Sequence, residues 1–329
     1  MVGATGRAAQ LVVSVFPRRF GIAFYFCVLL LILSRTIAEA AEISEPASLA
    51  ARALLLDAVN TGDKIVAVGD HGNIVISRDN GLTWTQSLAP TQALLTAVSF
   101  PDAQHGWAVG HEGGIMVSSD GGQTWQRQDD GKNLETVFLD VRFLSTTQGF
   151  AVGAYGKYLA TTNGGKTWTA AKPAEDEVHY NRLSAGSDGA LYLAGESGTL
   201  LVSHDSGKKW RKTDVPYDGS LFGALPLAQG ALIVYGLRGH IFRSDDQAAT
   251  WEPLNSEIKV LITSGLNLKT GLLVLGGQGG NFFVSHDAGH SFESWKPAGF
   301  SASVAGMVEA NDGAIVTVGE AGAVRLKLP

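Results

Sequence analysis

The stretch Ser118-Ser119-Asp120-Gly121-Gly122-Gln123-Thr124-Trp125 recurs six times along a chain of 329 residues. Each copy keeps the pattern Ser-x-Asp-x-Gly-x-Thr-Trp with small departures, at intervals of 41 to 43 residues. The third positions are Asp79, Asp120, Asn163, Asp205, Asp246 and Asp287. The closing aromatic residues are Trp84, Trp125, Trp168, Trp210, Trp251 and Phe292. A repeat of about 40 residues is typical of architectures in which one supersecondary unit is copied around an axis or along a stack.

A Gly-x-x-Gly pair precedes each copy and follows a short apolar run. Its first glycines are Gly69, Gly110, Gly153, Gly195, Gly236, Gly276 and Gly319, which makes seven. Within one unit, short runs at 94–100, 106–109, 114–119 and 124–127 alternate apolar and polar residues as strands do. No long window has helical periodicity. We therefore predict an all-β fold, a seven-bladed β-propeller over residues 41–329, with four strands in each blade.

The seventh unit differs from the others because only three strands can be assigned to it, at 303–309, 314–318 and 323–327. An unpaired sheet edge favours unwanted association, and closure of the ring removes it. Residues 41–52 are not assigned to any blade. We therefore expect the segment 43–51 to supply a closing outer strand, where Pro46 is compatible with an edge position.

Residues 1–40 have the pattern of a secretory signal peptide. Arg18 and Arg19 precede the apolar run 20–33, and Ala38-Glu39-Ala40 is a small-x-small cleavage pattern. The run is shorter than the roughly 20 apolar residues of a membrane-spanning helix. We expect cleavage near Ala40 and export to the periplasm; retention of residues 20–33 as a membrane anchor is the alternative. The single cysteine, Cys27, would leave with this segment.

Charge and composition narrow the class of partner. Residues 1–40 contain four arginines and one glutamate, so the mature chain would keep 21 basic and 30 acidic residues. An acidic chain without a basic cluster argues against nucleic-acid binding. The spacing of His71, His111, Asp70 and Glu112 matches no zinc motif, so we expect no metal and no cofactor. We also expect a monomer.

The repeated stretch predicts a reinforced hairpin turn. The Asp carboxylate can accept hydrogen bonds from backbone N–H groups ahead of it, the glycine allows a positive φ, and the aromatic residue buries a large surface. Departures are Asn163 for Asp, Lys209 for Thr and Phe292 for Trp. We expect Ala249 to replace the glycine of the fifth copy and to strain that turn. All six copies are interpreted as framework.

The Gly-x-x-Gly turns are the candidate binding rim, because they should share one face with the connections between blades. The candidate residues are Asp70, His71, His111, Glu112, Tyr155, Glu196, Arg238, Gln278 and Glu320. Two further candidates, Arg142 and Arg182, are placed on inner strands. Together with Arg238 they could bind a carboxylate.

The eight-residue stretch resembles the Asp-box, or bacterial neuraminidase repeat, which lies at the blade periphery in the families that carry it. Combined with turns such as Val109-Gly110 to Ile115, it makes the mature chain similar to the photosystem II stability and assembly factor-like propellers. The resemblance implies an exported, non-enzymatic protein that assists the assembly or function of a membrane protein complex. The arginine-rich patch ascribed to the photosynthetic factors has no clear counterpart here. We therefore interpret the chain as a non-photosynthetic relative, with a transporter as one candidate partner.

The Asp-boxes alone leave a second hypothesis open, a glycan-binding protein or a sialidase-like glycosidase. The Phe/Tyr-Arg-Ile-Pro motif of sialidases is absent, and no Tyr–Glu pair of the kind those enzymes use stands out. A Gly-x-Ser-x-Gly elbow and a P-loop are also absent. The sequence therefore favours a scaffold or accessory protein over an enzyme.

Overall fold

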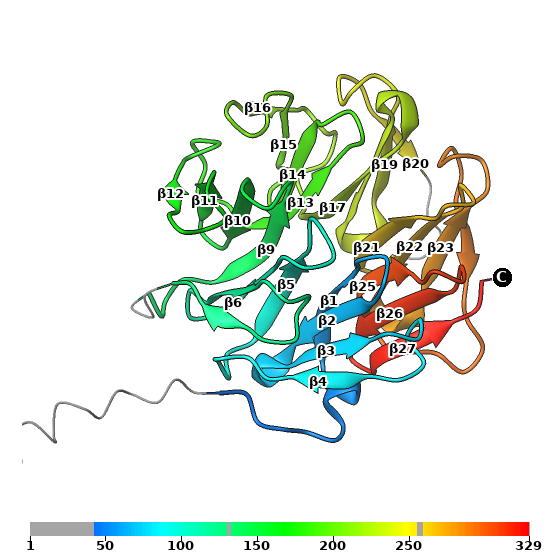
Figure 1. Cartoon of the computed structure of the whole chain (residues 1–329). Coiled ribbons are helices and arrows are strands. Elements are labelled where there is room, and N and C mark those ends of the chain that lie inside the picture. The colour runs from blue at the N-terminus through cyan, green and yellow to red at the C-terminus, as the bar shows by residue number, and fades with distance from the viewer. Residues whose placement is uncertain (1–42, 130–132, 255–258, 329) are drawn as a thin grey trace, which may run out of the picture. The chain divides into compact units, whose positions relative to one another are not determined.

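The computed structural model describes residues 43–129, 133–254 and 259–328, and the predicted signal peptide and its cleavage site lie outside them. Seven antiparallel sheets surround a central axis (Figure 1). The innermost strands of successive sheets contact one another, and the first contacts the last, so the ring is closed. The seven-bladed all-β prediction is confirmed. Outside the strands, regular structure in the described residues is limited to five 3-10 turns of three residues each.

Six sheets have four strands and the seventh has three. The first two blades comprise β1 (Leu55–Asn60), β2 (Ile65–Gly69), β3 (Ile74–Ser77), β4 (Thr85–Ser87), β5 (Leu95–Ser99), β6 (Gly106–Gly110), β7 (Ile115–Ser118) and β8 (Gln126–Arg127). The next two comprise β9 (Phe138–Phe143), β10 (Gly149–Gly153), β11 (Tyr158–Thr161), β12 (Thr169–Ala170), β13 (Tyr180–Ala185), β14 (Leu191–Gly195), β15 (Leu200–Ser203) and β16 (Arg211–Lys212). The last three comprise β17 (Leu221–Pro226), β18 (Leu232–Gly236), β19 (Ile241–Ser244), β20 (Glu252–Leu254), β21 (Ile262–Asn267), β22 (Leu273–Gly277), β23 (Phe282–Ser285), β24 (Glu293–Trp295), β25 (Val304–Glu309), β26 (Ile315–Gly319) and β27 (Gly322–Leu326).

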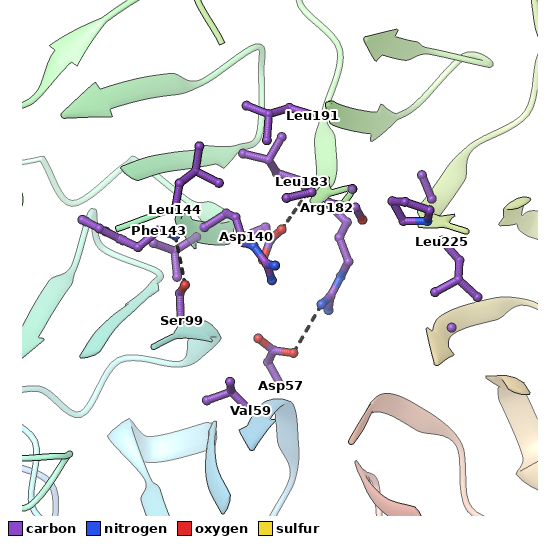
Figure 2. Close-up of a pocket in the computed structure, with 18 of the residues that line it drawn as sticks. Asp57, Val59, Ser99, Asp140, Phe143, Leu144, Arg182, Leu183, Leu191 and Leu225 are labelled. Carbon is purple, nitrogen blue, oxygen red and sulfur yellow. Dashed lines mark hydrogen bonds and ion pairs between the residues drawn. The ribbon is translucent and has the colours of Figure 1, made fainter. Parts of the chain in front are cut away.

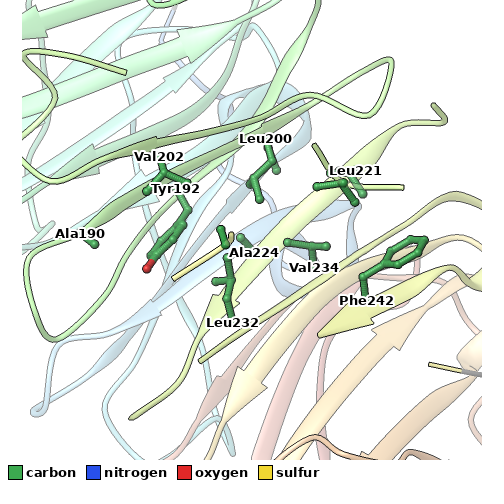
Figure 3. Packing of buried hydrophobic residues seen from close by; sticks show 12 residues of the cluster. Ala190, Tyr192, Leu200, Val202, Leu221, Ala224, Leu232, Val234 and Phe242 are labelled. Atoms are coloured by element: carbon green, nitrogen blue, oxygen red, sulfur yellow. The ribbon is translucent and has the colours of Figure 1, made fainter. Parts of the chain in front are cut away.

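The core lies between blades, because each blade buries both of its faces. In β14, Tyr192 and Ala194 face the fifth blade, where they pack in one cluster with Leu232 and Val234 of β18 (Figure 3). Leu191 and Leu193 of the same strand face the third blade instead. This period of two explains why the middle strands are apolar at nearly every position.

The two kinds of turn lie where the sequence places them, with one correction. The Gly-x-x-Gly turns join the second and third strands of a blade, and the Asp-boxes join the third and fourth. In the sixth blade the first glycine of the turn is Gly277, not Gly276, since Gly277 pairs with Ile262 as Gly69 pairs with Leu55. The seventh turn is shorter, because Gly319 pairs directly with Gly322.

The Asp-boxes share one pattern of hydrogen bonds, which is complete in the first, second, fifth and sixth copies. In the second box, Ser118 Oγ donates to Asp120 Oδ1 at 2.9 Å and accepts from Gly122 N at 2.8 Å. Thr124 donates to Asp120 twice, from N to Oδ1 at 2.9 Å and from Oγ1 to Oδ2 at 2.6 Å. The equivalent donors, Thr83 foremost, lower the pKa of Asp79 to about 2. Asn163 keeps the pattern, because its Nδ2 donates to Thr167 Oγ1 at 2.8 Å.

The residue of the fifth box that adopts the glycine conformation is Ala248, not Ala249. Ala248 has a φ of 66° and occupies the position of Gly122 in the second box. Its N–H still donates to Ser244 Oγ at 3.0 Å, and Thr250 keeps both of its bonds to Asp246. The fifth turn therefore accepts the unfavourable backbone conformation without losing hydrogen bonds.

The segment 43–51 forms no strand, so the expected closing strand is wrong. Ser44 N donates to Ala89 O at 2.8 Å, and Ala89 N donates back to Ser44 Oγ at 2.9 Å. Gln86 of β4 accepts from Ala47 N at 2.7 Å. These contacts hold the segment beside the first blade, and it forms no strand pairing with β27. It then enters the turn η1 (Ala50–Arg52), which contacts both β4 and β27.

Side chains and not a strand join the seventh blade to the first. Asn60 Nδ2 donates to Glu309 O at 2.7 Å, and Asn311 Nδ2 donates to Gly62 O at 2.8 Å. Arg325 donates from Nη1 to Asn80 O, also at 2.7 Å. These bonds satisfy backbone carbonyls across the junction where the two ends of the propeller meet.

The contact between η1 and the shortened seventh turn can be tested at Gly322. A Cβ there would lie 2.2 Å from Ala51 O, whereas a Cβ at Gly313 would meet no atom within 4 Å. Both glycines have positive φ, so alanine should cost about 1 kcal/mol of backbone strain at either. We expect Gly322→Ala to lower Tm at least twice as much as Gly313→Ala in differential scanning calorimetry. Equal losses would contradict a tight contact with η1.

The fourth Asp-box lacks one hydrogen bond, so a substitution that restores it should raise the stability of the protein. Lys209 N donates to Asp205 Oδ1 at 2.8 Å, but no hydroxyl reaches Oδ2 as Thr124 does for Asp120. Lys209→Thr supplies that donor and should raise Tm by about 2 °C. Lys208→Thr is the matched control, because the hydroxyl position belongs to residue 209. A rise in both variants would point to the loss of lysine charge.

Candidate functional site

A bulge interrupts the strand pairing near the start of every innermost strand. The register of each strand shifts after its first residue, for example between Leu55 and Asp57 in β1. Such bulges re-aim the side chain that follows. The residues at this position are Asp57, Ala97, Asp140, Arg182, Gly223, Ser264 and Gly306, which we call the inner ring. Three members carry charge and four are small.

The three charged members of the inner ring form one cluster (Figure 2). Arg182 Nη1 lies 3.3 Å from Asp57 Oδ1, although the two residues are 125 positions apart. Asp57 Oδ2 also accepts from Val98 N of the next blade at 3.0 Å. Asp140 Oδ2 likewise accepts from Leu183 N at 2.6 Å. The two carboxylates therefore bind neighbouring blades to one another as well as facing the axis.

Burial changes the acid–base behaviour of this cluster. It raises the pKa of the Asp140 carboxyl to about 6, a rise that Arg182 opposes. Burial also raises the pKa of Tyr235 to about 12. The ring of Tyr235 covers Gly223, where an added Cβ would lie 2.3 Å from the phenol oxygen. The inner-ring residue of the fifth blade is a glycine because the ring of Tyr235 occupies the space that a side chain would need.

Asp140, Arg182 and Tyr235 line a channel of about 950 Å³. The lining includes Asp57, Asp140 and Arg182, the later residues of the innermost strands, and the turn at 186–189. The rim turns are absent from it. The channel therefore opens on the face of the Asp-boxes, opposite the face predicted for binding.

The predicted inner-strand arginines lie together, but the third arginine does not join them. Arg142 and Arg182 both line the channel. Arg238 belongs to the turn η4 (Leu237–Gly239), at the other end of a blade, so three arginines do not converge on one carboxylate. Sequence reasoning missed Asp57 and Asp140. Alignment of the seven innermost strands on their glycine turns would have shown both as charged residues at positions that are otherwise mostly small.

Four rim candidates project from their turns as the third residue of Gly-x-x-Gly. They are His71, Glu112, Tyr155 and Arg238, each with φ between 54° and 59°, and all are exposed. Such a conformation is unfavourable for a residue with a side chain, so these four positions carry backbone strain. Of the remaining candidates, Gln278 is exposed, whereas Asp70 and His111 are half-buried.

Three rim acids make local contacts. Asp70 Oδ2 lies 3.0 Å from Nδ1 of His71 in its own turn. Glu320 Oε2 accepts from Ser303 N at 3.0 Å. Glu196 Oε2 accepts from His179 N at 3.1 Å, and the His179 ring packs edge-on against Tyr155 with centroids 4.7 Å apart. Within residues 43–129, 133–254 and 259–328, no three His, Cys, Asp or Glu side chains are arranged to hold a metal ion.

The comparison with protein families decides the classification. The family model of photosynthesis system II assembly factor YCF48 matches residues 82–135 and 130–328. The chain belongs to this family. No curated protein matches the sequence.

Solved structures agree with the fold. A structure of YCF48 bound to D1 peptide aligns with a TM-score of 0.70 at 19% identity, covering 84% of this chain and 94% of that one. YCF48 from Cyanidioschyzon merolae aligns with a TM-score of 0.69 at 16% identity, covering 86% and 97%. The WD40 propeller domain of Doa1 reaches 0.65 at 12% identity, covering 87% and 95%. At these identities the likeness concerns the fold.

The buried Asp140 should give the YCF48-like propeller a measurable pH dependence. Its folded pKa of about 6 lies above the ordinary value of 3.8, so its contribution to stability falls as pH rises from about 4 to 6. An asparagine amide at this position cannot titrate. We expect Asp140→Asn to gain stability relative to wild type between pH 4.5 and 7, by up to about 2 kcal/mol.

Urea unfolding at the two pH values measures this difference. The matched control is Asp214→Asn, since Asp214 is exposed. Parallel pH profiles for wild type and Asp140→Asn would contradict a raised pKa in the folded state.

Proposed function

We propose that this protein is an exported, non-enzymatic factor that binds a segment of a membrane protein and assists the assembly or function of its complex. Membership in the assembly-factor family, carried by the match over residues 82–135 and 130–328, is the main support. The solved YCF48 structure with D1 peptide supports a peptide-binding role for the fold. The signal-like residues 1–40 support a periplasmic monomer acting on a non-photosynthetic complex, with a transporter as one candidate.

The rim of blades three to five is the surface that we assign to the partner. Tyr155 is 76% exposed and contributes nothing to the core, although its backbone adopts an unfavourable φ of 54°. Its neighbour His179 pairs with Glu196, with Nδ1 3.5 Å from Oε1. An exposed aromatic residue beside a polar pair is the composition of a binding surface.

This surface continues without a break into the fifth blade. Gly198 N donates to Gly219 O at 2.8 Å, which joins the fourth rim turn to the loop that carries Tyr217. Tyr217 donates to Leu237 O at 3.1 Å and packs on His240, with ring centroids 4.4 Å apart. The exposed Arg238 follows. A chain segment with aromatic or aliphatic side chains and a negative charge would match these groups.

Affinity capture from crosslinked cell envelopes tests the proposal. Tyr155→Ala, Glu196→Gln and Arg238→Gln are combined in one rim variant. The control combines Arg78→Gln with Leu82→Ala, two exposed residues of the first Asp-box on the opposite face. We expect a stoichiometric membrane protein with wild type and control, and a loss of at least about fivefold with the rim variant.

Two outcomes would contradict the proposal. Recovery of the propeller alone would exclude a stable membrane partner. Equal capture by the rim variant would exclude this surface, provided that both variants melt within about 2 °C of wild type.

A further inference from the structure

We propose that the central channel binds a small organic carboxylate with an apolar body, held by Arg142. This inference concerns the face opposite the rim and is independent of the proposed partner. The evidence for it is a second layer of side chains. Each of them lies two residues after the inner-ring residue on its innermost strand. Side chains two positions apart in a strand point the same way. The layer comprises Val59, Ser99, Arg142, Ser184, Leu225, Leu266 and Val308, which we call the outer ring.

One side of the outer ring consists of hydrogen-bond donors. Ser99, Arg142 and Ser184 come from three consecutive blades, and all three line the channel. Ser99 Oγ accepts from Phe143 N at 2.9 Å, which leaves its O–H free to donate. Ser184 makes no hydrogen bond through its hydroxyl to any residue that the structure describes. Two hydroxyls thus flank one guanidinium at the same level of the channel.

Arg142 differs from Arg182 in forming no close ion pair with the described residues, although its charge acts on Asp140 and opposes the rise in that residue's pKa. Arg182 is paired with Asp57 at 3.3 Å. The exposed Arg142 makes no hydrogen bond or ion pair with the residues in the described part of the chain. A guanidinium with its donors free binds a carboxylate through two parallel hydrogen bonds. The geometry therefore favours an anionic group at the level of Arg142.

The inner ring limits how deep that anion can sit. Asp140 lies two residues before Arg142 on β9 and, with Asp57, makes the floor of the site acidic. A second negative group would meet two carboxylates at the floor, and the one guanidinium there, that of Arg182, is already paired with Asp57. A monoanion is favoured over a dianion for this reason.

The other side of the outer ring is apolar. Val59, Leu225 and Val308 line the channel at this level, and Figure 2 shows Leu225 on the opposite side of the channel from Ser99. A ligand that places its carboxylate on Arg142 would place its body against these side chains. The volume of about 950 Å³ lies in the range of small-molecule sites.

Isothermal titration with 4-phenylbutyrate tests the site, and 4-phenylbutyramide is the uncharged control ligand. We expect binding of the carboxylate to wild type, and at least about tenfold weaker binding of the amide. Arg142→Gln should weaken carboxylate binding by a similar factor. The control Arg78→Gln removes an exposed arginine beyond the channel and should bind as wild type does.

Three results would overturn the proposal. They are no binding of 4-phenylbutyrate at about 5 mM, equal binding of the amide, and equal weakening by Arg78→Gln and Arg142→Gln. Because Arg142 is exposed, its substitution should leave Tm within about 2 °C of wild type.

A competition experiment separates two sources of the carboxylate. An acetylated pentapeptide ending in a free leucine carboxylate is added to the 4-phenylbutyrate complex, and its C-terminal amide is the control. Displacement by the free acid alone would identify a chain terminus as a ligand of the site. Failure of both peptides would support a free small molecule, since the probe itself still requires Arg142. Displacement by the amide as strongly as by the acid would contradict carboxylate recognition.

Discussion

The structure depends on the burial of two apolar faces by every blade. A blade such as β13 to β16 places alternate side chains of its middle strands against two different neighbours, so no blade is stable with one face open. Removing apolar surface from water is the largest favourable contribution to folding. The ring must therefore close, and the contact of β25 with β1 satisfies the last two faces.

Two different kinds of contact close the ring between the seventh blade and the first. The first blade is complete with four strands of its own, and the seventh has three. Packing between β1 and β25 supplies the apolar burial, while Asn60, Asn311 and Arg325 supply hydrogen bonds to backbone carbonyls across the junction. The turn η1 covers the end of β27 at Gly322. The junction is therefore joined by side chains and by backbone contact instead of by a shared sheet.

Ring closure also creates the two surfaces to which we assign binding. On one face, seven glycine turns surround the axis, and Tyr155 and Arg238 in these turns are exposed and have a positive φ. On the other face, the innermost strands enclose a channel with paired charges at its floor and the exposed Arg142 above them. The channel presents a separate chemistry, suited to a smaller ligand.

The sequence by itself determined the blade number, the strand order and both kinds of turn, because these depend on local features. Alternating residues, glycine turns and the Ser-x-Asp-x-Gly-x-Thr hydrogen bonds all act within about ten positions. The tertiary structure alone decided that Asp57 meets Arg182, because only closure of the ring brings together residues 125 positions apart. It also decided the path of residues 43–51. Gln86 and Ala89 provide hydrogen bonds that hold this segment against the first blade, and no local pattern in the segment indicates those partners.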